Sequence, residues 1–253
     1  MMNRTFWGLL LAAFLFACKP QNKAQNIVNK SIEAHGGSQL SHAQFSFDFR
    51  KKHIEVALDE GHYVYESILN DSIDRVHDKL SNEGFSRSVN GNTLKLSEED
   101  QQRYGNTLNS VVYFALLPYH LNDPAANKEL LGETTIKGEP YYEIKVTFDQ
   151  EGGGTDHDDV FVYWIHQTKY TMDYLAYSFQ VNGGGTRFRE AYNIRQIEGI
   201  RFADYINYES TVQDFALEDY ESLFEEGKVE ELSRIRLENV EVSSTKNNTL
   251  AKN

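Results

Sequence analysis

The chain has 253 residues, 38 of them acidic and 25 basic, which gives a formal net charge of −13 at pH 7. Such acidity argues against binding to nucleic acid and against electrostatic docking on anionic lipid, because both need clusters of Lys and Arg. The only cysteine is Cys18, which excludes an intramolecular disulfide and a thiolate metal site.

The first 17 residues have the features of a secretory signal peptide. Arg4 provides a positive start, and the apolar run from Phe6 to Ala17 is too short to span a membrane, which takes about 20 apolar residues. The end of the run, Leu15-Phe16-Ala17-Cys18, resembles the lipobox of bacterial lipoprotein precursors, in which the cysteine is acylated and becomes the first residue of the mature chain. The alternative is an ordinary signal peptide that ends near a cysteine.

The lipobox resemblance implies that acyl chains on Cys18 tether the protein to a membrane. Two or more such chains hold a protein stably on a bilayer. Cleavage removes Arg4 and lowers the net charge from −13 to −14. Because Lys19 follows the cysteine in place of Asp, we expect the outer membrane, with the protein facing the periplasm. Residues 18–24 are expected to form the lipidated N-terminus and a linker.

The next expected element is an amphipathic helix over residues 24–35. Its apolar residues Ile27, Val28 and Ile32 recur at helical spacing, and Gly36-Gly37 is a typical C-terminal cap.

The pattern then changes to a period of two, which is typical of half-buried strands. Phe45, Phe47 and Phe49 alternate with polar residues, and Asn90-Gly91 is a strong hairpin signal. We expect strands at residues 45–49, 54–58, 63–65, 73–80 and 85–89.

The middle of the chain predicts helices. Ser97 and three acidic residues after it form a cap and an acidic first turn for a helix from residue 98 to about 116. The end of this helix is unusually apolar, and Pro118 stops or kinks it. Asp123-Pro124 then opens a second, short helix that ends at Leu131.

Strands resume after Gly132. We expect them at residues 142–148, 160–165, 172–179, 187–195, 200–208 and 232–242, with a short acidic helix at 217–224. The chain is therefore predicted to be mainly β (α+β), an antiparallel meander of about 10–11 strands with three or four helices. Residues 25–245 are expected to form one domain, followed by a polar tail at 246–253.

Four segments carry a family resemblance. They are Asn109–Tyr119, Tyr163-Trp164-Ile165, Met172–Tyr177 and Arg187-Phe188-Arg189. Through them almost the whole mature chain is similar to an uncharacterised family of Bacteroidota lipoproteins, known as a domain of unknown function. The order of elements also resembles, more distantly, the LolA/LolB class of lipoprotein carriers. That resemblance implies a strongly curved sheet that forms an unclosed half-barrel, with helices plugging its concave face over a cavity for acyl chains.

Two groups of residues are the candidate ligand site. The apolar helix end from Val111 to Tyr119 is expected to act as a lid over the cavity, and aromatic residues on strands that are apolar on both faces are expected to line it. The predicted ligand-binding residues are Val112, Tyr113, Leu116, Leu117, Trp164, Tyr174, Tyr177 and Phe188. Ordinary core packing is the alternative for each of them.

The principal hypothesis is a membrane-tethered periplasmic lipoprotein that binds a hydrophobic or lipid-like ligand. One alternative is a metal-dependent hydrolase that uses the loop Asp156-His157-Asp158-Asp159, although this loop lacks the spacing of a calcium-binding loop and fits a solvated turn better. The other is a structural envelope lipoprotein that engages partner proteins. We found no nucleophile elbow, phosphate loop or zinc-protease motif, and we expect no cofactor.

The arginines of the late strands also have two interpretations. Arg187, Arg189, Arg195 and Arg201 are expected on neighbouring strands, near Asp173 and Asp204. They can bind an anionic ligand or form cross-strand ion pairs, and we favour the ion pairs.

Overall fold

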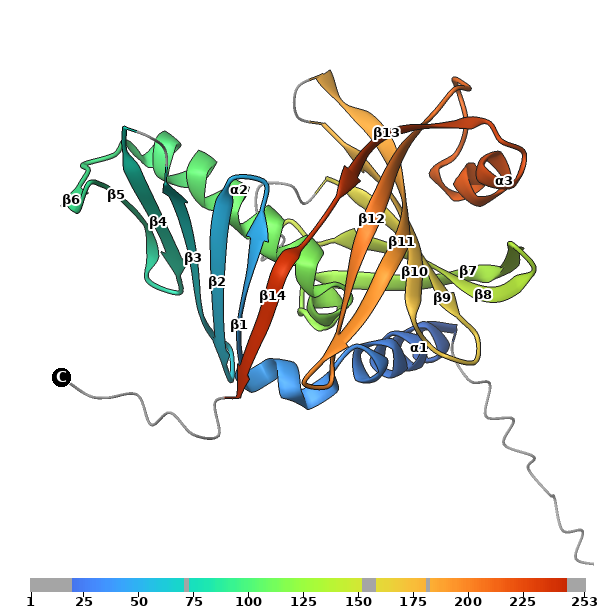
Figure 1. The fold of residues 1–253 in the computed structure, drawn as a ribbon. Coiled ribbons are helices and arrows are strands. Elements are labelled where there is room, and N and C mark those ends of the chain that lie inside the picture. Colours follow the sequence, from blue (N-terminus) through green and yellow to red (C-terminus); the bar gives the residue numbers. More distant parts are fainter. Residues whose placement is uncertain (1–19, 71–72, 152–157, 181–182, 245–253) are drawn as a thin grey trace, which may run out of the picture.

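Two antiparallel sheets of seven strands each face one another across helix α2 (Glu98–Leu116) in the computed structural model (Figure 1). The structure describes residues 20–70, 73–151, 158–180 and 183–244. The first sheet has the order β14-β1-β2-β3-β4-β5-β6 and the second has the order β13-β12-β11-β10-β9-β8-β7.

The strands of the first sheet come from the N-terminal part of the chain and from its end. They are β1 (Ala43–Phe49), β2 (Lys52–Asp59), β3 (His62–Asn70), β4 (Arg75–Ser81), β5 (Gly84–Val89), β6 (Asn92–Thr93) and β14 (Glu238–Ser244). The strands of the second sheet are β7 (Ala126–Ile136), β8 (Glu139–Phe148), β9 (Val160–His166), β10 (Met172–Phe179), β11 (Gly185–Ile197), β12 (Ile200–Ser210) and β13 (Val229–Ile235).

The two sheets adjoin where the chain passes from β13 to β14. Only Arg236 and Leu237 separate these strands, which are edge strands of the second and the first sheet. The opposite edges, β6 and β7, do not pair with each other, so the curved surface stays open. The predicted mainly-β, antiparallel and unclosed architecture is confirmed.

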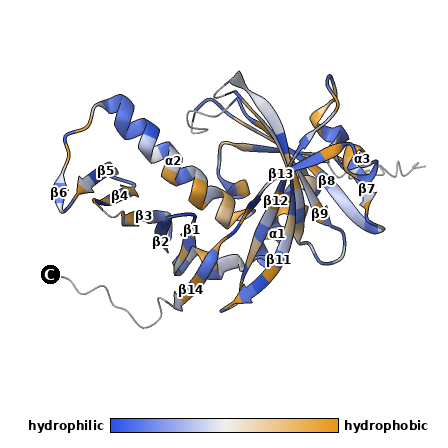
Figure 2. Ribbon diagram, turned by 45° about the horizontal axis from the view of Figure 1, so that its top comes forward, coloured by the Kyte–Doolittle hydropathy of each residue, from blue (hydrophilic) through white to orange (hydrophobic). Residues whose placement is uncertain are grey.

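The helices cover the sheets on different sides. They are α1 (Pro20–Ala34), α2 and α3 (Tyr220–Glu225), with the short 3-10 helices η1 (Gly37–His42), η2 (Tyr119–Asn122) and η4 (Leu217–Asp219). The helix α1 packs on β7, and α2 contacts β3, β4, β5 and β12. Figure 2 shows that the C-terminal half of α2, which enters the space between the sheets, is the hydrophobic half.

Each sheet has its own hydrophobic core. In the first sheet Phe45, Phe47 and Ile54 are buried against Val112 and Leu116 of α2. The second sheet is buried on both faces. On β9, Phe161, Tyr163 and Ile165 face the cluster under α1, while Val162 and Trp164 face the cluster under α3. This alternation follows from the two-residue period of a strand.

The structure has 14 strands in its described residues, against the 10–11 expected, because three strands were not predicted. The segment expected to be a helix up to Leu131 is instead β7, which pairs with β8 from Ala126↔Phe148 to Ile136↔Glu139. Its residues favour a helix locally, but pairing with a neighbouring strand overrides that preference. The expected strand 232–242 is two strands, and β6 has only two residues.

The N-terminal helix also begins earlier than predicted. It starts at Pro20 and not at residue 24, so most of the expected linker is helical. The signal sequence and Cys18 lie outside the described residues. Within the part of the chain that the structure describes, no helix combines the length and the apolar character needed to cross a membrane.

Candidate functional site

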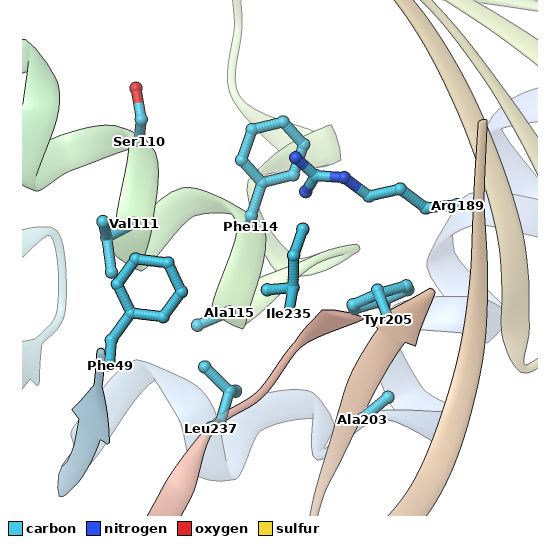
Figure 3. A pocket seen from close by; sticks show the side chains of 10 residues that line it. All are labelled: Phe49, Ser110, Val111, Phe114, Ala115, Arg189, Ala203, Tyr205, Ile235 and Leu237. Carbon is cyan, nitrogen blue, oxygen red and sulfur yellow. The ribbon is translucent and has the colours of Figure 1, made fainter. Parts of the chain in front are cut away.

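An apolar pocket with a cavity volume of about 200 Å³ lies between the C-terminal half of α2 and the second sheet (Figure 3). Three parts of the fold form its walls: α2, the strands β11 and β12, and the β13–β14 connection with the end of β1. The lining residues are Phe49, Ser110, Val111, Phe114, Ala115, Arg189, Ala203, Tyr205, Ile235 and Leu237.

The helix contributes one face to the pocket and another to the core. Val111, Phe114 and Ala115 have the spacing i, i+3, i+4, so they lie on one side of α2. The core side consists of Leu108, Val112 and Leu116, together with Gly105. The three pocket-facing side chains are only half-buried, whereas Val112 and Leu116 are fully buried. Val111 and Ala115 also pack against the core of the first sheet and Phe114 against the core under α1, so the pocket adjoins both cores.

Small side chains leave the pocket unfilled. Ala203 on β12 and Ala115 on α2 both line it, and Tyr205 follows Ala203 on the same face of the strand. Ile235 and Leu237 have the same two-residue spacing at the end of β13 and just beyond it.

One charged side chain, Arg189 on β11, enters this apolar pocket. Figure 3 shows its guanidinium next to the ring of Phe114. Arg189 is only 8% exposed, and its Cζ lies 4.1 Å from the centre of the Phe114 ring and 5.0 Å from that of Tyr177. Its Nη2 donates a hydrogen bond of 2.7 Å to the hydroxyl of Tyr177. Its buried Nε has no hydrogen-bond partner among the described residues.

Burial disfavours the charged form of Arg189 and lowers its pKa, while the nearby Tyr177 opposes this shift. An arginine nevertheless keeps its proton in proteins. The pocket therefore holds a permanent positive charge, and none of its ten lining residues is acidic.

The three other arginines of these strands have carboxylate partners. Arg195 lies 2.9 Å from Asp204, Arg201 lies 2.8 Å from Asp173, and Arg187 lies 3.8 Å from Glu209. The favoured interpretation as ion pairs is confirmed for these three. Arg189 is different, because no ion pair joins it to any residue that the structure describes.

The eight predicted ligand-binding residues do not gather at this pocket. Val112 and Leu116 are buried in the core of the first sheet, and Leu117 is buried in the cluster that contains α1. Tyr177 comes nearest, since its hydroxyl holds Arg189 and its ring lies 5.4 Å from Phe114.

The aromatic residues on the other face of the second sheet are covered by protein. Trp164, Tyr174 and Phe188 pack in the cluster around Tyr220 of α3, where the rings of Phe188 and Tyr220 stack at 5.6 Å. These strands are apolar on both faces, as the sequence indicated, but the segment around α3 fills the face on which the three residues lie. Phe188 and Arg189 are adjacent on β11, so they point to opposite faces.

Tyr113 lines a different cavity, of about 510 Å³, on another side of α2. The ring of Tyr113 stacks on His120 at 5.4 Å, and burial raises the pKa of Tyr113 to about 12. His120 lies 3.3 Å from Asp123. This second cavity also contains His62 and Asn109, so its walls offer many hydrogen-bonding groups. It is therefore less suited to an acyl chain than the apolar pocket.

The predicted acidic loop is only partly described. Asp156 and His157 lie outside the described residues, and Asp158 and Asp159 have interaction partners. His166 at the end of β9, another histidine that could ligate a metal, pairs with Glu139 at 2.9 Å. The described part of the chain contains no group of three or more His, Cys, Asp or Glu side chains that could hold a metal ion.

Sequence reasoning named Arg189 only as one of four arginines for which ion pairs were favoured, and within the expected lid from Val111 to Tyr119 it did not distinguish the pocket face of α2 from the core face. The helical spacing of Val111, Phe114 and Ala115 was visible, but it gives no indication of which face meets the core. For Arg189 the local sequence offered no distinguishing signal, because it lies between Phe188 and Glu190 on a strand that carries three arginines.

Comparisons with known proteins identify a family without an assigned function. Residues 4–237 match the model of a family described as "Family of unknown function (DUF6503)". No curated protein matches the sequence. The expected resemblance to an uncharacterised family is confirmed.

Similar solved structures include a LolA superfamily protein from Nitrosomonas europaea, with 13% identity over 87% of this chain and 91% of that chain and a TM-score of 0.49. A DUF1329 family protein from Desulfovibrio piger ATCC 29098 has 10% identity over 89% and 94% and a TM-score of 0.48. A putative outer membrane lipoprotein-sorting protein domain from Vibrio parahaemolyticus has 8% identity over 89% and 94% and a TM-score of 0.48.

Proposed function

The chain belongs to the family of unknown function DUF6503, a membership that brings no activity with it, and we propose from the geometry that it binds a hydrophobic or lipid-like ligand in the pocket beside α2. The observation that carries this proposal is the unfilled apolar pocket itself, of about 200 Å³. The pocket is partly open, so its apolar walls meet water until a ligand covers them.

The walls of the pocket suit an apolar occupant. Val111, Phe114 and Ile235 are half-buried apolar side chains that line it. Removing such surface from water stabilises a complex by about 25 cal/mol per Å². A ligand that covers these side chains completes a hydrophobic layer between α2 and the second sheet.

The volume limits how much of a ligand fits. Cavities of about 150 Å³ bind benzene, whereas typical ligand sites have about 300–1,000 Å³. The pocket of about 200 Å³ thus accepts one end of an alkyl chain. A longer chain requires an outward shift of the C-terminal half of α2, which is the lid role expected for residues 111–119.

The N-terminus supports a membrane-tethered location. The expected acylation site, Cys18, is two residues before the start of α1 at Pro20. An acylated Cys18 holds the domain close to the membrane surface, facing the periplasm from the outer membrane. The mass of the mature protein from native membranes tests this step, because a tethered form begins at Cys18 with two or three acyl chains. An unmodified mature chain, or an unchanged membrane fraction for Cys18→Ala, contradicts it.

The ligand proposal is tested with soluble protein that lacks residues 1–18 and is purified without detergent. Titration calorimetry with dodecanol is expected to show one site in the wild type. Ala115→Leu should weaken binding about tenfold because it occupies the pocket, while Thr107→Leu, on an exposed position of the same helix, should not change it. Equal dodecanol binding by wild type and Ala115→Leu refutes the proposal, as does failure of every amphiphile with a twelve-carbon chain to bind the wild type.

A further inference from the structure

The positive charge of Arg189 in the apolar pocket carries an inference about the ligand. We propose that the pocket selects an amphiphile with an anionic headgroup, a carboxylate or a phosphate ester, whose oxygens pair with the guanidinium of Arg189 while its alkyl chain lies along the apolar walls. This inference rests on the proposed function, because it specifies the class of ligand that the same pocket binds.

The first argument is the missing counter-charge. Arg189 is 8% exposed, and the described residues include no carboxylate within ion-pair distance of it. Burying an unpaired charge costs several kcal/mol even after relaxation. The contacts with Phe114 and Tyr177 offset part of this cost, since a cation is attracted to the face of an aromatic ring. An anionic headgroup supplies the compensation that the protein itself lacks.

The second argument is the contrast with the neighbouring arginines. Arg187, Arg195 and Arg201 come from the same pair of strands, and each has an aspartate or glutamate within 4 Å. In a chain with 38 acidic residues, a buried arginine without such a partner is an exception. It lies in the wall of the apolar pocket, and not in a solvated position where water replaces a partner.

The third argument is the orientation of the guanidinium. The hydrogen bond from Nη2 to Tyr177 and the packing on Phe114 hold it at the pocket wall. That hydrogen bond uses one of the five N–H donors of the guanidinium. In Figure 3, Arg189 is on one side of the pocket and Phe49 and Val111 are on the opposite side. A headgroup at Arg189 therefore directs the alkyl chain towards Phe49 and Val111.

The acidity of the whole chain makes this pairing selective. A net charge of −13 repels anions at long range, so a soluble anion without an alkyl chain gains little from the site. An anion therefore binds well only when an alkyl chain adds its hydrophobic contribution to the local pairing with Arg189. Acetate and inorganic phosphate are accordingly expected not to bind at millimolar concentration.

The test compares three ligands with the same alkyl chain: dodecanoate, dodecyl phosphate and dodecanol, titrated at pH 8 by calorimetry. Arg189→Met is expected to weaken the two anionic ligands about 10- to 100-fold, because a hydrogen bond to a charged group contributes about 1.5–3 kcal/mol. Dodecanol binding should change less than threefold. Arg187→Met is the matched control, since Arg187 is two residues away on the same face of β11 and is expected to leave all three affinities unchanged.

The possible outcomes separate this inference from the function on which it rests. Equal affinity of the wild type for dodecanoate and dodecanol, or an equal loss of both in Arg189→Met, overturns the anionic headgroup and leaves the hydrophobic site standing. Failure of all three ligands to bind the wild type overturns both. If Arg189→Met does not fold, Arg189→Lys decides the matter, because it keeps the charge and is expected to keep the preference for dodecanoate over dodecanol.

Discussion

Filling the pocket with protein atoms is expected to stabilise the fold and to weaken ligand binding at the same time. Ala115 lies on the pocket face of α2 and is half-buried. Ala115→Leu adds three carbon atoms, and each buried methylene contributes about 0.8 kcal/mol, which gives about 2.4 kcal/mol for complete burial. Because the pocket is partly open, we expect about 1–2 kcal/mol. Leucine is nearly as good a helix former as alanine, so the helix itself is not weakened.

The free energy of unfolding, measured by urea denaturation, tests this expectation. Thr107→Leu adds apolar surface at an exposed position of the same helix and should change the free energy by less than about 0.5 kcal/mol. A loss of more than 1 kcal/mol in Ala115→Leu would mean that the added atoms collide with a filled interior. The unfilled space on which the proposed function depends would then not exist.

Three further predictions concern the rest of the fold. Gly105→Ala should stabilise the protein by about 1 kcal/mol in urea denaturation, because alanine favours the helix and the new methyl group meets Leu80 and Phe85 at an ordinary contact distance of 3.6 Å. Gly138→Ala should instead destabilise it by about 1–2 kcal/mol, because Gly138 has a φ of +80°. Burial and nearby acidic groups raise the pKa of Glu143 to about 7, so the folded state binds the extra proton and loses stability as the pH rises from about 4.5 to 7. Glu143→Gln should therefore stabilise by about 1–3 kcal/mol in urea at pH 8 and much less at pH 5. Burial, followed by the charge of Arg201, lowers the pKa of His35 to about 3. The folded state therefore favours the neutral form of His35, and this contribution to the free energy of unfolding is lost as the pH falls below 6.5. The wild type should lose about 2 kcal/mol from this source at pH 5, and His35→Gln should remove that loss.

The sequence predicted most elements of the fold because their signals are local. Ser97 accepts a hydrogen bond from the backbone N–H of Asp100, as the capping pattern indicated, and α2 ends at Leu116, just before Pro118. Strand alternation likewise predicted β1 and β8 within a few residues. The segment of β7 was misjudged because its local preference for a helix is weaker than the ladder that it forms with β8.

The site was harder to predict because it depends on which faces meet. The sequence identified the apolar end of α2, but the choice of Val112 and Leu116 as ligand contacts selected the face that packs on the first sheet. A change of one residue along the helix, to Val111 and Ala115, reaches the pocket. Helical periodicity predicts that apolar side chains form a stripe along the helix, but only the tertiary structure shows which part of the protein packs against that stripe.

Three features that each cost folding free energy coincide at this pocket. Alanines at positions 115 and 203 leave a void, Arg189 carries a buried charge without a carboxylate partner among the described residues, and half-buried apolar side chains such as Phe114 face the opening. Each has a simple remedy within the chain: a larger side chain, an acidic neighbour or a polar substitution. Independent defects of folding would be scattered over the molecule. An amphiphile with an anionic headgroup compensates all three at once, because its alkyl chain fills the void and covers the apolar walls while its oxygens neutralise the guanidinium.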